Sequence, residues 1–185
     1  IDENPDVVVT GSGNLGNIWL NRYPARATYE QMNADYPRLI EKLLGTSGVG
    51  FIVVKHATGY KCLSAEGSIE LTNKTVANSN PLAAYPAETT DALLRLAKMS
   101  VAPDLIVVSS CEPGSNEVHA FEELVGNHGG VGGWQREAIL QPPPPPGPGF
   151  AGRCMRTRIR NCAVRRSIWG QPAAIEPGFS IFGRL

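Results

Sequence analysis

The 185-residue chain lacks the patterns that mark several common protein classes. Its four cysteines form no C-x-x-C pair, which excludes a zinc ribbon and a thioredoxin-type site, and they are too few for a disulfide-stapled miniprotein. No run approaches about 18 apolar residues, so no transmembrane segment is predicted and the fragment is expected to be soluble. There is no signal peptide, and the chain opens on Ile1 rather than methionine, which indicates a piece of a longer protein.

The chain has no excess of either charge, with 17 Lys+Arg and 17 Asp+Glu, so its total charge gives no reason to expect a nucleic-acid partner. The distribution is uneven, because residues 1–150 have a net charge of −6 and residues 151–185 a net charge of +6. Five consecutive prolines lie in the segment 141–150, which can form neither a helix nor a central strand. We therefore predict a domain over 1–140, a polyproline and glycine linker over 141–150, and a basic tail over 151–185 that is disordered or frameshifted.

Apolar runs and capping signals predict alternating strands and helices. Buried strands are expected at 6–10, 49–54 and 105–108, and a hairpin at 60–71. Helices are expected from the capping box that begins at Thr28, with a restart at Pro37 and a stop at Gly45, and over the amphipathic segment 86–99. The order of the strand at 6–10, the helix and the strand at 49–54 predicts a βαβ unit and therefore the α/β class.

The segment Gly11-Ser12-Gly13-Asn14-Leu15-Gly16 matches G-x-G-x-x-G directly after a predicted strand. In a dinucleotide site, this turn leads into a helix whose N-terminal amides approach a pyrophosphate. Residues 17–26 are a poor helix, and the acids at the expected distance, Glu30 and Asp35, fall in the next helix instead of at a strand end. We therefore interpret the glycines as a tight bend or pocket wall, with Gly11, Ser12, Gly13 and Asn14 as candidate substrate-pocket residues.

The histidines give one candidate metal ligand. His128 stands between small residues in Gly126-Asn127-His128-Gly129-Gly130, where an imidazole can reach a metal or a substrate. One histidine is not a zinc site, because zinc needs three or four ligands. His56 is expected at a strand end and His119 at the surface of a short strand. The acid pair Glu122-Glu123 is interpreted as a solvated turn or a cap, with acid/base catalysis as the alternative.

Three segments together resemble a known family. These are 5–16, 48–54 and, most specifically, Ala120-Phe121-Glu122-Glu123-Leu124-Val125-Gly126-Asn127-His128-Gly129-Gly130-Val131-Gly132-Gly133-Trp134-Gln135. They are similar to the C-terminal part of alkaline-phosphatase-superfamily proteins, in the bacterial type I phosphodiesterase/nucleotide-pyrophosphatase-like group. The resemblance covers residues 4–140 and does not extend to the tail.

The resemblance implies part of a doubly wound, mostly parallel sheet with helices on both faces, and the change of composition after residue 140 adds an irregular C-terminal tail to this expectation. It implies hydrolysis of a phosphate ester by a Thr or Ser nucleophile with two divalent metals, usually zinc, in an enzyme that in some members has upstream membrane segments. The matching metal ligand here is His128. In this family the other ligands come from an Asp near the start of the enzyme, the Thr or Ser nucleophile, an Asp-x-x-x-His pattern and an Asp-His pattern, and this sequence has none of them. We therefore expect a fragment that is inactive alone and holds no complete metal site.

Two other functions remain as alternatives. One is a nucleotide-binding module built on the glycine turn at 11–16. The other is a non-catalytic interaction protein that presents the proline run at 142–146 and the arginines of the tail. Deletion of residues 141–185 tests the interaction-protein alternative, because partner binding should disappear only if that alternative is correct.

Overall fold

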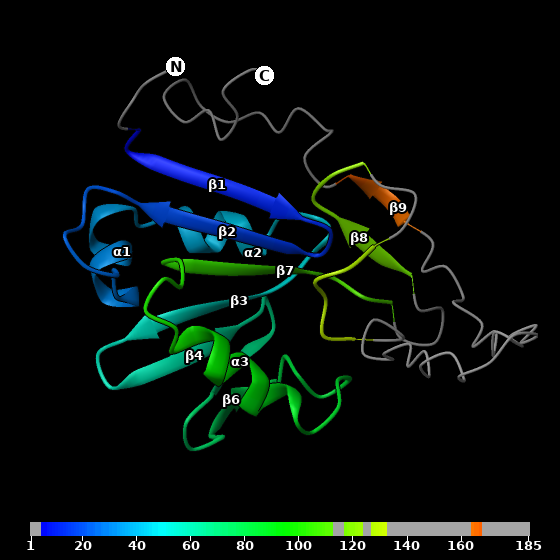
Figure 1. Cartoon of the computed structure of the whole chain (residues 1–185). Coiled ribbons are helices and arrows are strands. Elements are labelled where there is room, and N and C mark those ends of the chain that lie inside the picture. Colours follow the sequence, from blue (N-terminus) through cyan, green and yellow to red (C-terminus); the bar gives the residue numbers. More distant parts are fainter. Residues whose placement is uncertain (1–4, 113–116, 124–126, 133–163, 168–185) are drawn as a thin grey trace, which may run out of the picture.

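The computed structural model describes residues 5–112, 117–123, 127–132 and 164–167. Its main feature is a seven-stranded sheet in the order β1-β2-β7-β3-β4-β5-β6 (Figure 1). All neighbouring strands are antiparallel. The strands are β1 (Val7–Ser12), β2 (Leu15–Leu20), β3 (Val49–His56), β4 (Gly59–Leu63), β5 (Gly67–Glu70), β6 (Val76–Asn78) and β7 (Leu105–Ser109).

The expected doubly wound, mostly parallel sheet is therefore wrong. Short connections determine the outcome: two residues join β1 to β2, and β3, β4, β5 and β6 follow one another as hairpins. A tight hairpin reverses the chain, so its strands must pair antiparallel, whereas parallel neighbours need a long crossover. Strands β2 and β6 lie in segments for which the sequence analysis predicted no strand, and these two strands complete the hairpins.

The predicted βαβ unit between residues 6–10 and 49–54 is also wrong. Strand β1 is paired only with β2 among the described strands, and its residues are half-buried or exposed instead of buried. The helical crossover starts from β2 and leads to β3, and these two strands point the same way because both are antiparallel to β7. Strand β7 lies between them, so the crossover skips one position in the sheet.

The predicted helix signals at Thr28, at Gly45 and over 86–99 are confirmed, whereas the expected restart at Pro37 lies just before the second helix, whose N-cap is Arg38. Helix α1 (Tyr29–Asp35) begins at the expected capping box, in which Gln31 N donates to Thr28 Oγ1 at 3.3 Å and Thr28 N donates to Gln31 Oε1 at 2.9 Å. Helix α2 (Leu39–Leu44) ends at Gly45. Helix α3 (Thr89–Ala97) lies inside the expected segment 86–99.

Two apolar clusters, one on each face of the sheet, make up the described core. Alternate residues of β7 point to opposite faces. Helices α1 and α2 cover the first face, and α3 covers the second (Figure 1). The first cluster includes Met32, Leu43, Ile52 and Leu105, and the second includes Phe51, Val53, Leu93, Ile106 and Val108.

A two-stranded sheet lies beside the end of β1 (Figure 1). It pairs β8 (Val118–Ala120) in parallel with β9 (Val164–Ser167). The predicted linker and the rest of the predicted tail lie outside the described residues. Within the described ranges, no helix combines the length and the apolar character that a bilayer span requires.

Candidate functional site

The glycine-rich segment forms the turn of the β1–β2 hairpin. Ser12 pairs with Leu15, so Gly13 and Asn14 alone make the connection. Gly13 has a φ of +59°, a conformation that favours glycine at the first position of a two-residue hairpin turn. The turn leads into a strand and not into a helix. The pyrophosphate-binding geometry at a helix N-terminus is therefore not formed at this segment.

This hairpin turn lies against the loop that contains His128, 114 positions further along the chain. Asn14 N donates to the His128 carbonyl oxygen at 2.8 Å. A Cβ at position 13 would overlap that same oxygen and the Asn127 side chain. Gly129, with a φ of +83°, similarly passes close to the Ser12 carbonyl. The structure thus brings together the two candidate regions that the sequence indicated separately.

Asn127 holds the other side of the His128 backbone. Its Oδ1 accepts a hydrogen bond from His128 N at 2.8 Å, and its Nδ2 donates to the His119 carbonyl oxygen at 3.3 Å. The His128 residue is therefore fixed through both its N–H and its C=O, while it remains exposed. An exposed imidazole can contact a metal or a substrate, and here the backbone that carries it is already ordered.

A buried polar cluster supports the turn from below. Asn14 is 1% exposed, and its Nδ2 donates to Ser109 Oγ at 2.5 Å and to the His119 carbonyl at 3.0 Å. Ser109 Oγ donates to the same carbonyl at 2.6 Å. Asn14 is thus a structural residue of the site, and a substrate cannot reach its side chain. Of the predicted pocket residues, Gly13 is likewise buried, whereas Gly11 and Ser12 are exposed.

The backbone amides of the turn already have partners. Gly13 N donates to Glu122 Oε1 at 2.8 Å, and Phe121 N donates to the Gly13 carbonyl at the same distance. With Asn14 N bonded to His128, neither central amide of the turn is available for a phosphate. The Glu122 carboxylate therefore holds the hairpin in place.

A second imidazole, His119 on β8, lies next to this site. Its Nδ1 is 2.8 Å from Ser110 Oγ. The sequence analysis placed His119 on a short strand, which is confirmed, but gave it no function. Spacing could not reveal the pair, because strand pairing brings Ser110 and His119 together across nine positions of the chain.

His128 does not belong to a metal site among the described residues. Across these ranges, no three His, Cys, Asp or Glu side chains lie close enough together to hold a metal ion. His56 is used elsewhere, with its Nε2 2.6 Å from Glu70 Oε2 in a contact that links β3 to β5. It ends β3, as expected. Burial raises the pKa of the Cys62 thiol, which therefore stays protonated and is a poor ligand.

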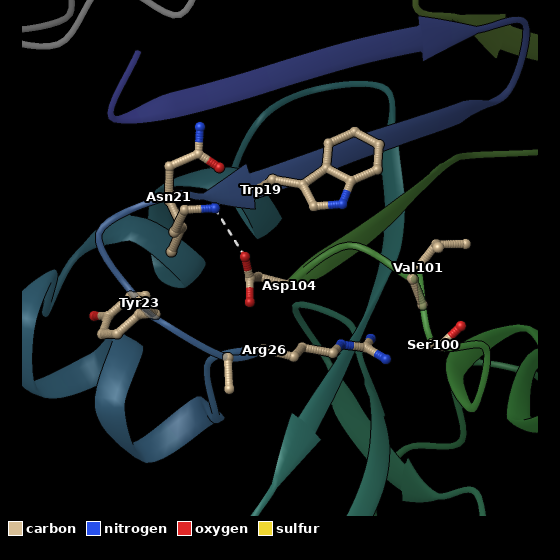
Figure 2. A pocket seen from close by; sticks show the side chains of 10 residues that line it. Trp19, Asn21, Tyr23, Arg26, Ser100, Val101 and Asp104 are labelled. Carbon is tan, nitrogen blue, oxygen red and sulfur yellow. Dashed lines mark hydrogen bonds between the residues drawn. The ribbon is translucent and has the colours of Figure 1, made fainter. Parts of the chain in front are cut away.

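A pocket of about 640 Å³ lies at a different place, between the end of β2, the loop after it and the loop before β7 (Figure 2). Asp104 in its wall is 5% exposed. Its carboxylate accepts hydrogen bonds from Leu20 N at 2.8 Å and from Ala27 N at 2.6 Å. The carboxylate thus fastens the loop that leaves β2 to the start of β7.

Arg26 extends through this pocket wall towards the loop with Ser100 (Figure 2). Its Nη1 donates to the Ala97 carbonyl at the end of α3, and its guanidinium carbon lies 5.4 Å from the centre of the Tyr60 ring. Desolvation lowers the pKa of Arg26. Nε and Nη2 are buried and have no hydrogen-bond partner among the described residues, so a ligand in the pocket cannot reach them without displacing a neighbour. The Asp104 carboxylate and Arg26 Nη1 are therefore used in contacts between segments of the chain.

Comparison with known proteins adds no family assignment, because no family model, curated protein or solved structure matches the chain.

Proposed function

We propose that the chain is the C-terminal part of a metal-dependent phosphoric ester hydrolase of the phosphodiesterase/nucleotide-pyrophosphatase-like group. In this proposal, His128 supplies one metal ligand, and a preceding region of the same enzyme supplies the other ligands and the nucleophile. The substrate is a small molecule with a phosphate ester. The antiparallel sheet differs from the sheet that the resemblance implies, so the His128 loop alone supports the assignment to this group.

The observation that supports the proposal most directly is the double clamp on the His128 backbone. Asn127 Oδ1 and Asn14 N bind its N–H and C=O, each at 2.8 Å, and leave the residue exposed. Glycine at positions 13 and 129 allows the two loops to approach so closely. The clamp fixes the backbone from which the imidazole projects, so that binding of a metal would have to order only the side chain of His128.

The chain's own residues would have limited roles in catalysis. His128 would donate a ring nitrogen lone pair to a divalent metal, which in such enzymes stabilises the charge that develops on phosphoryl oxygens. Glu122 and Asn127 would keep the His128 loop against the hairpin. Because the described residues form no group of three ligands, we expect the chain alone to be inactive.

The nucleotide-binding alternative is less well supported. It requires free amides at the turn and a helix after it, whereas both central amides are bonded and β2 follows. The interaction-protein alternative depends mainly on segments outside the described residues.

The test is hydrolysis of bis(p-nitrophenyl) phosphate by the chain expressed together with the region encoded directly upstream. We expect turnover that requires added zinc, and a decrease in kcat/KM of at least about 100-fold in His128→Ala, because a metal ligand is lost. His56→Gln is the matched control, since His56 lies at the far end of β3 and should leave turnover unchanged.

Equal activity of His128→Ala and wild type would show that His128 belongs to an ordinary loop. An upstream region without an Asp-x-x-x-His pattern would remove the remaining ligands and overturn the proposal as a whole.

A further inference from the structure

We propose that the pocket beside Asp104 binds a small molecule with a carboxylate group, and that Arg26 is the residue that binds this carboxylate. The pocket has a volume of about 640 Å³, within the range of roughly 300–1,000 Å³ that is common for small-molecule sites. It lies at the end of β2, whereas the His128 loop contacts the turn before β2. The inference therefore goes beyond the proposed hydrolase and does not depend on it.

The first support is that the Arg26 guanidinium is held in one orientation. Its Nη1 donates to the Ala97 carbonyl at the end of α3, and its guanidinium carbon lies 5.4 Å from the centre of the Tyr60 ring. On the backbone side, the next residue, Ala27, donates its N–H to the Asp104 carboxylate at 2.6 Å. The side chain is thus fixed at both ends, and its remaining donors have a defined direction.

The second support is that two of these remaining donors are adjacent nitrogens without partners. Nε and Nη2 of Arg26 are buried and have no hydrogen-bond partner among the described residues. In a guanidinium group, the N–H bonds of Nε and Nη2 lie side by side on one edge, and this fork matches the two oxygens of a carboxylate. A buried donor without an acceptor is unfavourable, because it has lost its hydrogen bonds to water. A ligand carboxylate would satisfy both donors.

The charge of Arg26 leads to the same class of ligand. Within the described part of the chain, no ion pair joins Arg26 to a carboxylate, although Asp104 lies in the same pocket wall. The Asp104 carboxylate accepts two backbone N–H groups instead. A carboxylate brought by a ligand would therefore also supply the ion-pair partner of Arg26.

The third support is the loop after α3, which gives a route to the buried fork. This loop begins next to the guanidinium, because Nη1 bonds to Ala97, and Figure 2 shows Arg26 extending towards Ser100 and Val101. Val101 is 75% exposed and Met99 is 55% exposed. The hydrogen bonds that residues 99–102 make to other described residues stay within the loop and the end of α3. Displacement of this loop therefore breaks few contacts and would uncover Nε and Nη2.

The other lining residues define the body of the ligand. Trp19 and Tyr23 are half-buried and offer flat apolar surface to a bound molecule. Figure 2 shows the indole nitrogen of Trp19 on the side of the ring that faces Arg26. The Asp104 carboxylate would repel a second negative charge on the ligand. The pocket thus favours a monoanionic carboxylate on a flat apolar body over a phosphate dianion.

The test is titration of benzoate into the 185-residue chain at constant ionic strength, followed through the indole N–H signal of Trp19 by NMR. We expect a saturable shift at Trp19. The amide signals of Ser100 and Val101 should move over the same range of benzoate concentration, because the loop is displaced. Benzamide, the neutral analogue, and inorganic phosphate should each bind at least about tenfold more weakly than benzoate.

Arg26→Lys keeps the positive charge but removes the fork, so it should weaken benzoate binding about tenfold or more. Arg22→Lys is the matched control. Arg22 also lies over tyrosine rings, those of Tyr23 and Tyr36, but it is exposed and does not line the pocket. This control should bind benzoate like the wild type.

Absence of a saturable shift at Trp19, or equal affinities of the wild type for benzoate and benzamide, would overturn the inference. Equal affinities of Arg26→Lys and Arg22→Lys for benzoate would also overturn it, as would phosphate binding as tight as that of benzoate. The comparison of benzoate with benzamide uses the wild-type chain, so it decides the question even if Arg26→Lys does not fold.

Discussion

At the scale of single residues, buried polar side chains join segments that are distant in the sequence. Asp104 binds two backbone amides, and Asn14 connects the hairpin turn to β7 and β8. A buried donor that loses its acceptor pays the full cost of leaving water. Substitution of such a residue should therefore lower the free energy of unfolding more than substitution of an exposed polar residue.

Asp104→Asn should lower the free energy of unfolding by about 2–3 kcal/mol. The amide can accept only one of the two hydrogen bonds, because its NH₂ group would face the other backbone N–H. Urea unfolding followed by circular dichroism measures the change. Asp6→Asn is the matched control, since Asp6 is exposed and should alter stability by less than about 0.5 kcal/mol. Equal stability of the two variants would contradict a structural role for Asp104.

At the scale of elements, the β1–β2 hairpin is the part that shapes the candidate site. Its two-residue turn lies against the His128 loop, and Glu122 and Phe121 bind Gly13 from the other side. Because backbone groups make most of these contacts, the close approach depends on the missing side chain at position 13.

Gly13→Ala should destabilise the chain by about 2–4 kcal/mol, because it combines a strained positive φ with overlap against the His128 carbonyl. The His128 loop should also move, which NMR amide shifts of residues 127–130 would show. Gly45→Ala, with a φ of −79° at the end of α2, should cost less than about 1 kcal/mol. Unchanged amide shifts in the loop of Gly13→Ala would mean that the hairpin does not hold it.

At the scale of the whole molecule, the sheet has a protected centre and weaker margins. Strands β3 and β7 pair with each other, and all five residues of β7 are buried. The three residues of β6 are all exposed. Local opening costs less free energy where few apolar contacts must break.

Amide hydrogen exchange should therefore be slowest in β3 and β7, and faster by at least about 100-fold in β6. Exchange followed residue by residue with NMR tests this order. Rates in β6 as slow as those in β7 would show that β6 is covered by something other than its pairing with β5.

Several elements could be predicted because their signals are local. The capping box of Thr28 and Gln31, the stop at Gly45 and the hairpin between β4 and β5 all depend on residues a few positions apart. The order and direction of the strands were predicted wrongly. Strand β2 has no run of β-branched residues, and its membership in the sheet depends on pairing with β7, about 90 positions later.

The candidate site divides in the same way. The sequence alone determined that residues 11–16 turn tightly and that His128 stands among small residues, because glycine patterns act through local backbone freedom. No local pattern indicates that these two segments meet, that Ser110 lies opposite His119, or that β7 enters between β2 and β3. Those contacts depend on which strands pair, and pairing is selected by burial of the whole sheet rather than by neighbours in the chain.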